Sequence, residues 1–194
     1  HTSIRMNFLE EAYEAVDALD LDDPVLMCEE LGDVLMQVAF HTCMEQETGR
    51  FTWEQVCDGV CQKLIERHQN IFGTQPGYEG ITDWDALKNK EKGRRTLADD
   101  LESVPRAMPA LMRAAKLQKR AARHGAALQG ADAAALADAA ENLQTAQPAS
   151  AQAEQAVGEL LFAAANLARQ AGVDPEQALQ KANEAFCTAA GPVA

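Results

Sequence analysis

The amino-acid sequence predicts an all-α protein, built as two tandem helical domains of the four-helix-bundle type. Every strong hydrophobic pattern along the 194 residues has helical spacing, and none shows the alternation of a half-buried strand. Asp23-Pro24 and Asp174-Pro175 each place a proline after an N-cap acid, which is the signature of a helix start. The two halves also look like weak copies of each other, because Gly32-Asp33-Val34-Leu35 aligns with Gly158-Glu159-Leu160-Leu161.

Three long helices are expected in the first part of the chain. The second of them begins at Pro24 and ends before Gly49, a residue type that commonly terminates helices. Thr52 followed by Gln55 is a capping-box signature, which predicts the start of the third. The expected ranges are 3–19, 24–47 and 52–67.

The rest of the chain is predicted to contain a loop and shorter helices. Residues 68–82 hold three glycines and a proline and should form a loop. Further helices are expected over residues 83–95, from Ser103-Val104-Pro105 to Gly125, and from Pro175 to Gly191. After Gly125 the composition shifts to Ala and Gln with few charges. We therefore divide the chain into a first domain, 1–125, which includes a basic helix, and a shortened, degenerate second domain, 126–194.

Charge and composition exclude several classes of partner. The net charge is -13, whereas nucleic acids and anionic membranes require a basic face. No apolar run approaches the roughly 18 residues of a membrane-spanning helix. The five cysteines are an odd number without the clustering of a zinc site, so they are interpreted as free, buried thiols in a reducing cytosol.

An acid-rich stretch near the start of the chain is the candidate functional site. Twelve Asp or Glu and no Lys or Arg lie between Met6 and Gly49. On a helical wheel Glu11 and Glu14 share one face of the first helix, and Glu30 and Asp33 share one face of the second. Antiparallel packing would bring these four carboxylates together, and a hard divalent cation would relieve their repulsion. Each acid pair taken alone is equally consistent with a solvated helix face.

The second helix is apolar around most of its circumference, so we expect it to be largely buried. One narrow polar stripe on it carries Glu30, Asp33, Gln37 and His41. Gly32 in the middle of the helix costs about 1 kcal/mol relative to Ala, which suggests that another backbone packs closely there.

Cations that could meet phosphate groups follow downstream. Lys63 and Arg67 are four residues apart, as are Trp84 and Lys88. Phosphates require such cations, and a base requires a flat stacking partner. The alternative reading makes Trp84 a core anchor and the lysines parts of a solvated surface.

The motif Glu10-Glu11-x-x-Glu14 followed by Glu30-x-x-Asp33 resembles the signature of the all-α nucleoside triphosphate pyrophosphohydrolases, and of MazG in particular. The wider context supports the resemblance over about residues 1–125, with Lys63 to His68 and Leu117 to Ala122 among the matching segments. The family attacks the α-phosphorus of a nucleoside triphosphate with water, giving a monophosphate and pyrophosphate. MazG chains normally also carry a segment before the position of His1.

The resemblance implies a role for each candidate residue. Mg²⁺, or Mn²⁺ in its place, would be the cofactor, and Glu10 beside the catalytic ligand Glu11 would orient or deprotonate the attacking water. The implied metal ligands are Glu11, Glu14, Glu30 and Asp33. The implied contacts to the nucleoside triphosphate are Asn7, Lys63, Arg67, Trp84 and Lys88.

The second copy departs from this pattern. It keeps Asp138 and Glu141, but Ala156 stands where the second motif requires an acid, and Ala185 stands at the position of Arg67. We therefore expect no catalytic metal there, and a role in scaffolding or dimerisation.

Two functions of different classes follow. The first is a Mg²⁺-dependent pyrophosphohydrolase, working as a homodimer, that clears non-standard or surplus nucleotides. The alternative is a helical module that binds a nucleotide or a protein without turnover. A di-iron bundle is disfavoured, because no Glu has a His three residues after it.

Overall fold

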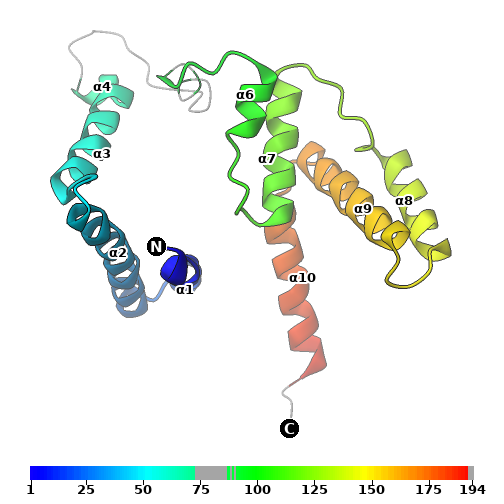
Figure 1. Ribbon diagram of the computed structural model, residues 1–194. Coiled ribbons are helices and arrows are strands. Elements are labelled where there is room, and N and C mark those ends of the chain that lie inside the picture. Colours follow the sequence, from blue (N-terminus) through cyan, green and yellow to red (C-terminus); the bar gives the residue numbers. More distant parts are fainter. Residues whose placement is uncertain (73–86, 88, 90, 192–194) are drawn as a thin grey trace. The chain divides into compact units, whose positions relative to one another are not determined.

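The computed structural model describes residues 1–72, 87, 89 and 91–191, and the side chains of 69 and 70 are not described. The described residues form helices and connections without a strand, which confirms the all-α class (Figure 1). The chain forms two compact units, His1–Thr82 and Asp83–Ala194. This division by contacts differs from the division by composition after Gly125, and the two tandem family domains stay a prediction. None of the helices described combines the length and the hydrophobicity needed to cross a bilayer.

The first unit contains the three long helices that the sequence predicts. The segment expected to be a loop after residue 67 begins instead with one helical turn, because the backbone N–H groups of Ile71 and Phe72 both bond to the carbonyl of His68 at 2.8 and 2.9 Å. The elements are the 3-10 helix Thr2–Ile4, α1 Arg5–Asp20, α2 Pro24–Glu47, α3 Trp53–Arg67 and α4 Gln69–Phe72.

Local capping explains where these helices begin. The Asp23 carboxylate accepts hydrogen bonds from the backbone N–H groups of Val25 at 2.9 Å and Leu26 at 3.2 Å. The Thr52–Gln55 capping box is confirmed, with the Gln55 side chain accepting from the Thr52 backbone N–H at 2.9 Å. Each cap satisfies backbone donors that the helix itself leaves unpaired.

Helices α1 and α2 form an antiparallel pair. Phe8 lies beside His41, with ring centroids 5.9 Å apart. One turn further along α1, Glu11 meets Gln37 through a hydrogen bond of 3.3 Å. Residues further along α1 therefore contact residues nearer the start of α2, so the two helices run in opposite directions. This packing buries the small side chains Ala15 and Ala18 of α1.

Within the described residues of the first unit, much of the apolar surface of α2 is exposed, so the expectation of a largely buried helix is wrong for this unit. Leu31, Leu35 and Phe40 are 50%, 57% and 49% exposed, whereas Gln37 is only 4% exposed. Helix α1 covers one face of α2, and Gln37 of the polar stripe lies on that face. The expected close packing at Gly32 is also wrong, since a Cβ there would meet no described atom within 4 Å.

The second unit contains five described helices. Much of the helix expected over residues 83–95 lies outside the described residues. No bounds were predicted for α6, α8 or α9, and α6 starts with a capping box between Thr96 and Asp99. The basic helix begins at Ala110 rather than at Ser103, because the segment between them holds Pro105 and Pro109. The last helix matches its prediction. These helices are α6 Leu97–Glu102, α7 Ala110–Arg123, α8 Ala133–Thr145, α9 Ala151–Gln170 and α10 Pro175–Ala190.

Alanine-lined packing and a buried ion pair hold the second unit together. Ala139 on α8 and Ala163 on α9 are 1% and 0% exposed, so these two helices approach closely. The Asp100 carboxylate of α6 is buried and pairs with Arg120 of α7 at 3.0 Å and with His124 at 3.2 Å. Arg120 also donates to the Asp100 carbonyl, which ties the short α6 to α7.

Candidate metal centre on the first helix pair

Three carboxylates converge between α1 and α2. Glu11 and Glu14 on α1 and Glu30 on α2 each offer an oxygen, and these oxygens lie within 4.8 Å of one another. Glu11 and Glu30 are half-buried and Glu14 is exposed. The spacing of three residues places the first two on one face of α1, and the antiparallel pairing brings the third opposite them.

The electrostatics of this cluster favour a cation. Desolvation raises the pKa of Glu14, and the neighbouring charges of Glu11 and Glu10 raise that pKa further. Desolvation also raises the pKa of Glu30, followed by the charges of Glu14 and Asp33. Repulsion between carboxylates crowded in this way makes it unfavourable for all of them to be ionised. A cation bound among them would offset that repulsion.

Asp33 lies close enough for its charge to act on Glu14 and Glu30, but it is not part of the group of converging oxygens. The three carboxylates alone suit a small hard cation such as Mg²⁺, which takes one or more carboxylates and completes its shell with waters and phosphate oxygens. The residues present therefore fit the cofactor that the resemblance implies, and their role as its ligands stays a prediction.

Gln37 belongs to this site, although the sequence placed it only on the polar stripe of the second helix and predicted no role for it. Its side-chain amide is buried and donates to Glu11 Oε1 at 3.3 Å. An amide in this position helps to orient the Glu11 carboxylate. The available signal was the polar stripe of the second helix, in which Gln37 follows Asp33 by one turn.

The other candidate residues are placed differently. Asn7 and Glu10 are exposed on α1, within one turn of Glu11. Lys63 is exposed on α3, and it forms no hydrogen bond or ion pair with a carboxylate of the described residues. Arg67 is half-buried in the last turn of α3. The predictions for Trp84 and Lys88 fall outside the described residues.

The degenerate copy gives an internal comparison. Ala156, which replaces an acid, is 2% exposed on α9. Asp138 and Glu159 line a cavity of about 620 Å³ on α8 and α9, together with small and apolar residues. The absence of a catalytic metal from this second copy stays a prediction.

An all-α chain in which two antiparallel helices gather three carboxylates belongs, by its fold and site, to the helical proteins that can hold a hard divalent cation. Comparison with known proteins is more specific. The profile of the MazG nucleotide pyrophosphohydrolase domain matches residues 1–72. These residues include every carboxylate of the candidate site.

Relatives extend the match over most of the chain. A nucleoside triphosphate pyrophosphohydrolase of Escherichia coli K12 is 38% identical over 187 residues, which cover 92% of this chain and 71% of the relative. A nucleoside triphosphate pyrophosphohydrolase/pyrophosphatase MazG of Thermotoga maritima is 37% identical over 188 residues, covering 96% and 72%. A nucleoside triphosphate pyrophosphohydrolase of Mycobacterium tuberculosis is 36% identical over 129 residues, covering 64% and 39%. The chain belongs to the MazG nucleotide pyrophosphohydrolase family.

Proposed function

We propose that this chain hydrolyses nucleoside triphosphates to monophosphate and pyrophosphate at the α1–α2 carboxylates, with Mg²⁺ as cofactor. The observation that carries the proposal is the convergence of Glu11, Glu14 and Glu30 within 4.8 Å. Support comes from the relatives named nucleoside triphosphate pyrophosphohydrolase, which match most of the chain.

In the proposed reaction, the oxygen of a water molecule bonds to the α-phosphorus, and the bond from that phosphorus to the bridging oxygen breaks. Pyrophosphate leaves with the bridging oxygen. The bound cation supplies neutralisation of the phosphate charge. Glu11, Glu14, Glu30 and Asp33 would hold it, while Glu10, exposed beside them, orients the water and accepts its proton.

The remaining candidates bind the substrate. Lys63 and Arg67 would contact the triphosphate, since both are cations on one face of α3. Trp84 and Lys88 would complete the nucleotide site, with Asn7 contributing from α1. We further propose that the enzyme acts in the cytoplasm, where it removes non-standard or surplus nucleotides.

We also propose that the active form is a homodimer. Apolar side chains of the first unit lie exposed along α2 and α3, including Leu35 at 57% and Leu64 at 47%. A soluble protein rarely leaves such a continuous apolar face uncovered. A second copy of the unit would complete a bundle of four long helices from the α1–α2 pairs.

The test is pyrophosphate release from a panel of triphosphates with Mg²⁺. Glu30→Gln should reduce kcat/KM by about 100-fold or more. Substitution of residues that only support metal ligands already lowers metal affinity or activity by roughly 10–100-fold, and Glu30 is proposed as a ligand itself. Glu159→Gln makes the same change at the corresponding region of the second copy and should leave the rate unchanged. Equal rates for wild type and Glu30→Gln would refute the proposed site.

The alternative, a module that binds nucleotides without turnover, is favoured by the degenerate second copy, where Ala156 replaces an acid. It predicts that the panel gives saturable binding of a triphosphate but no pyrophosphate. The same experiment therefore separates the two functions.

A further inference from the structure

The basic helix α7 concentrates positive charge in an otherwise acidic chain. Between Glu102 and Asp132 there is no Asp or Glu. The same segment carries the six cations Arg106, Arg113, Lys116, Lys119, Arg120 and Arg123. Arg120 is used in the buried ion pair with Asp100.

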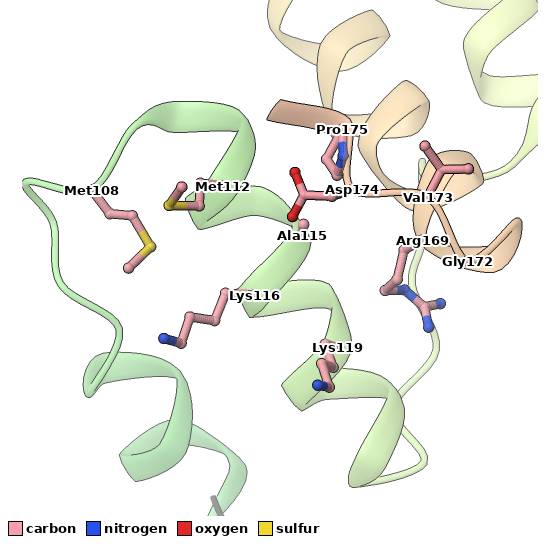
Figure 2. Close-up of a pocket in the computed structure, with 10 residues that line it drawn as sticks. All are labelled: Met108, Met112, Ala115, Lys116, Lys119, Arg169, Gly172, Val173, Asp174 and Pro175. Carbon is pink, nitrogen blue, oxygen red and sulfur yellow. The ribbon is translucent and has the colours of Figure 1, made fainter. Parts of the chain in front are cut away.

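Two of these cations line a cavity inside the second unit. The cavity has a volume of about 480 Å³ and lies among the loop before α7, α7 itself, the end of α9 and the start of α10 (Figure 2). Its size falls in the range of sites for small molecules, roughly 300–1,000 Å³. Lys116 and Lys119 are three residues apart on α7 and so share a face, and Arg169 adds a third cation from the last turn of α9.

Arg169 is held in place by a neutral partner. Its Nε and Nη2 both donate to Asn166 Oδ1, at 3.0 and 2.9 Å. Asn166 is 2% exposed, and its own amide donates to the carbonyl of Ala131 at 2.6 Å. This chain of hydrogen bonds orients the guanidinium without neutralising its charge. Neither of these two bonds uses Nη1, and Arg169 lines the cavity.

The acids beside the cavity are already engaged. Asp174 is the only carboxylate in the lining, and its Oδ1 accepts from the backbone N–H groups of Glu176 and Gln177, both at 3.0 Å. Glu176 in turn accepts from the Met112 backbone N–H at 3.2 Å, which joins α10 to the start of α7. No acid of the described residues forms a salt bridge with Lys116, Lys119 or Arg169. Three cations and one capping carboxylate thus line the cavity.

The rest of the lining is apolar. In Figure 2 Met108 and Met112 lie at one end of the lining, and Arg169 and Val173 lie at the other. Thioether side chains adapt to flat and irregular surfaces and contact aromatic rings favourably. A ligand that matches both ends carries phosphate and a flat, largely apolar ring.

We propose that this cavity binds a nucleotide in the absence of a divalent metal, with the phosphate on Lys116, Lys119 and Arg169 and the base against the two methionines. The site is separate in chemistry from the carboxylate cluster of the first unit, because its charge is positive and needs no bridging cation. The proposal does not rest on hydrolysis at the first unit.

The test is calorimetric titration of the whole chain with AMP in EDTA, which withholds the metal from the carboxylate cluster. We expect saturable binding. Lys116→Glu and Lys119→Glu should each weaken it by about tenfold or more, since a charge-assisted hydrogen bond is lost and repulsion is gained. The matched control is Lys181→Glu, an exposed lysine of α10 that lines none of the described cavities and should bind AMP as wild type does. Circular dichroism checks that each variant keeps its helices.

Inorganic phosphate should bind at least about tenfold more weakly than AMP if the methionine end contributes to affinity. Absence of binding, equal loss in Lys181→Glu, or equal affinity for phosphate and AMP would each overturn the proposal. Glu30→Gln should retain AMP binding, and Lys119→Glu should retain pyrophosphate release. The failure of this site and the failure of the proposed catalytic function are therefore distinguishable.

Discussion

At the scale of single residues, Gln37 links the carboxylate cluster to the packing of the first unit. Its amide is 4% exposed on the face of α2 that meets α1, and it donates to Glu11 at 3.3 Å. A buried amide that binds a metal ligand fixes the orientation of that ligand. Gln37 is therefore a positioning residue in our interpretation, acting through Glu11.

We expect Gln37→Leu to keep the fold and weaken the response to Mg²⁺. Leu fills a similar volume, but Glu11 loses the donor that orients it. The Mg²⁺ concentration for half-maximal activity should rise by about 10-fold, within the roughly 10–100-fold range for residues that support metal ligands. Gln46→Leu, an exposed position on the same helix, is the control. An unchanged Mg²⁺ response in Gln37→Leu would contradict the positioning role.

Glu14 gives a prediction on stability. Burial and the charges of Glu11 and Glu10 raise the pKa of Glu14, so its ionised form is disfavoured in the folded chain. Glu14→Gln removes one of the repelling charges. In EDTA at neutral pH this variant should melt at a higher temperature than wild type, while the rise in Tm that Mg²⁺ gives to wild type should be reduced. A lower Tm in EDTA, with the Mg²⁺ effect intact, would show that Glu14 is not part of a metal cage.

At the scale of elements, the short helix α6 depends on α7 for its position. Six residues are too few for an isolated helix to be stable. Its capping box stabilises the start of the helix locally, and the buried ion pair between Asp100 and Arg120 holds the helix against α7. The Ser103 hydroxyl also accepts a hydrogen bond from Arg120, just beyond the end of α6.

We expect Arg120→Met to destabilise the second unit by about 3–5 kcal/mol, the usual cost of removing one member of a buried ion pair. The Asp100 carboxylate would stay buried with His124 as its remaining side-chain partner. Urea unfolding followed by circular dichroism measures the effect, and Lys181→Met on the exposed surface of α10 serves as control. Restored stability in the double variant Arg120→Met/Asp100→Leu would confirm that the unpaired charge causes the loss.

At the scale of the whole molecule, the first unit has polar groups where a core is expected and apolar groups on its surface. Gln37, Thr42 and Glu45 are the buried residues of α2, whereas Leu35 and Phe40 are about half exposed. A single antiparallel pair cannot cover α2 on all sides. This is the physical reason for proposing a second copy over the uncovered face.

Leu35→Glu should convert the proposed dimer to a monomer, because a charge replaces an apolar side chain at the interface. Light scattering after gel filtration gives the mass. Val25→Glu makes the same change in the first turn of α2, at a side chain that is 77% exposed, and should leave the dimer intact. A wild-type chain that is monomeric at micromolar concentration would contradict the homodimer and favour a cover from elsewhere in the same chain.

The sequence by itself determined the helical class, the starts of α2, α3 and α10, and which acids are candidates for the site. N-caps such as Asp23, Thr52 and Asp174 act on backbone groups two or three residues away, so their effect can be read locally. The same holds for the spacing of Glu11 and Glu14, which fixes their common helix face. The starts of α6, α8 and α9 were not predicted, and the start of α7 was placed too early, before the two prolines that precede it.

Only the tertiary structure decided which groups meet across helices. The hydrophobic pattern of the sequence could not show that Gln37, on the polar stripe of α2, packs against α1 while Leu35 stays exposed. Nor could it show that residues from Met108 to Pro175 enclose one cationic cavity. Such contacts depend on the side on which each helix packs. The physical reason is that local propensity acts within about one turn, whereas a site is assembled by packing between segments distant in the sequence.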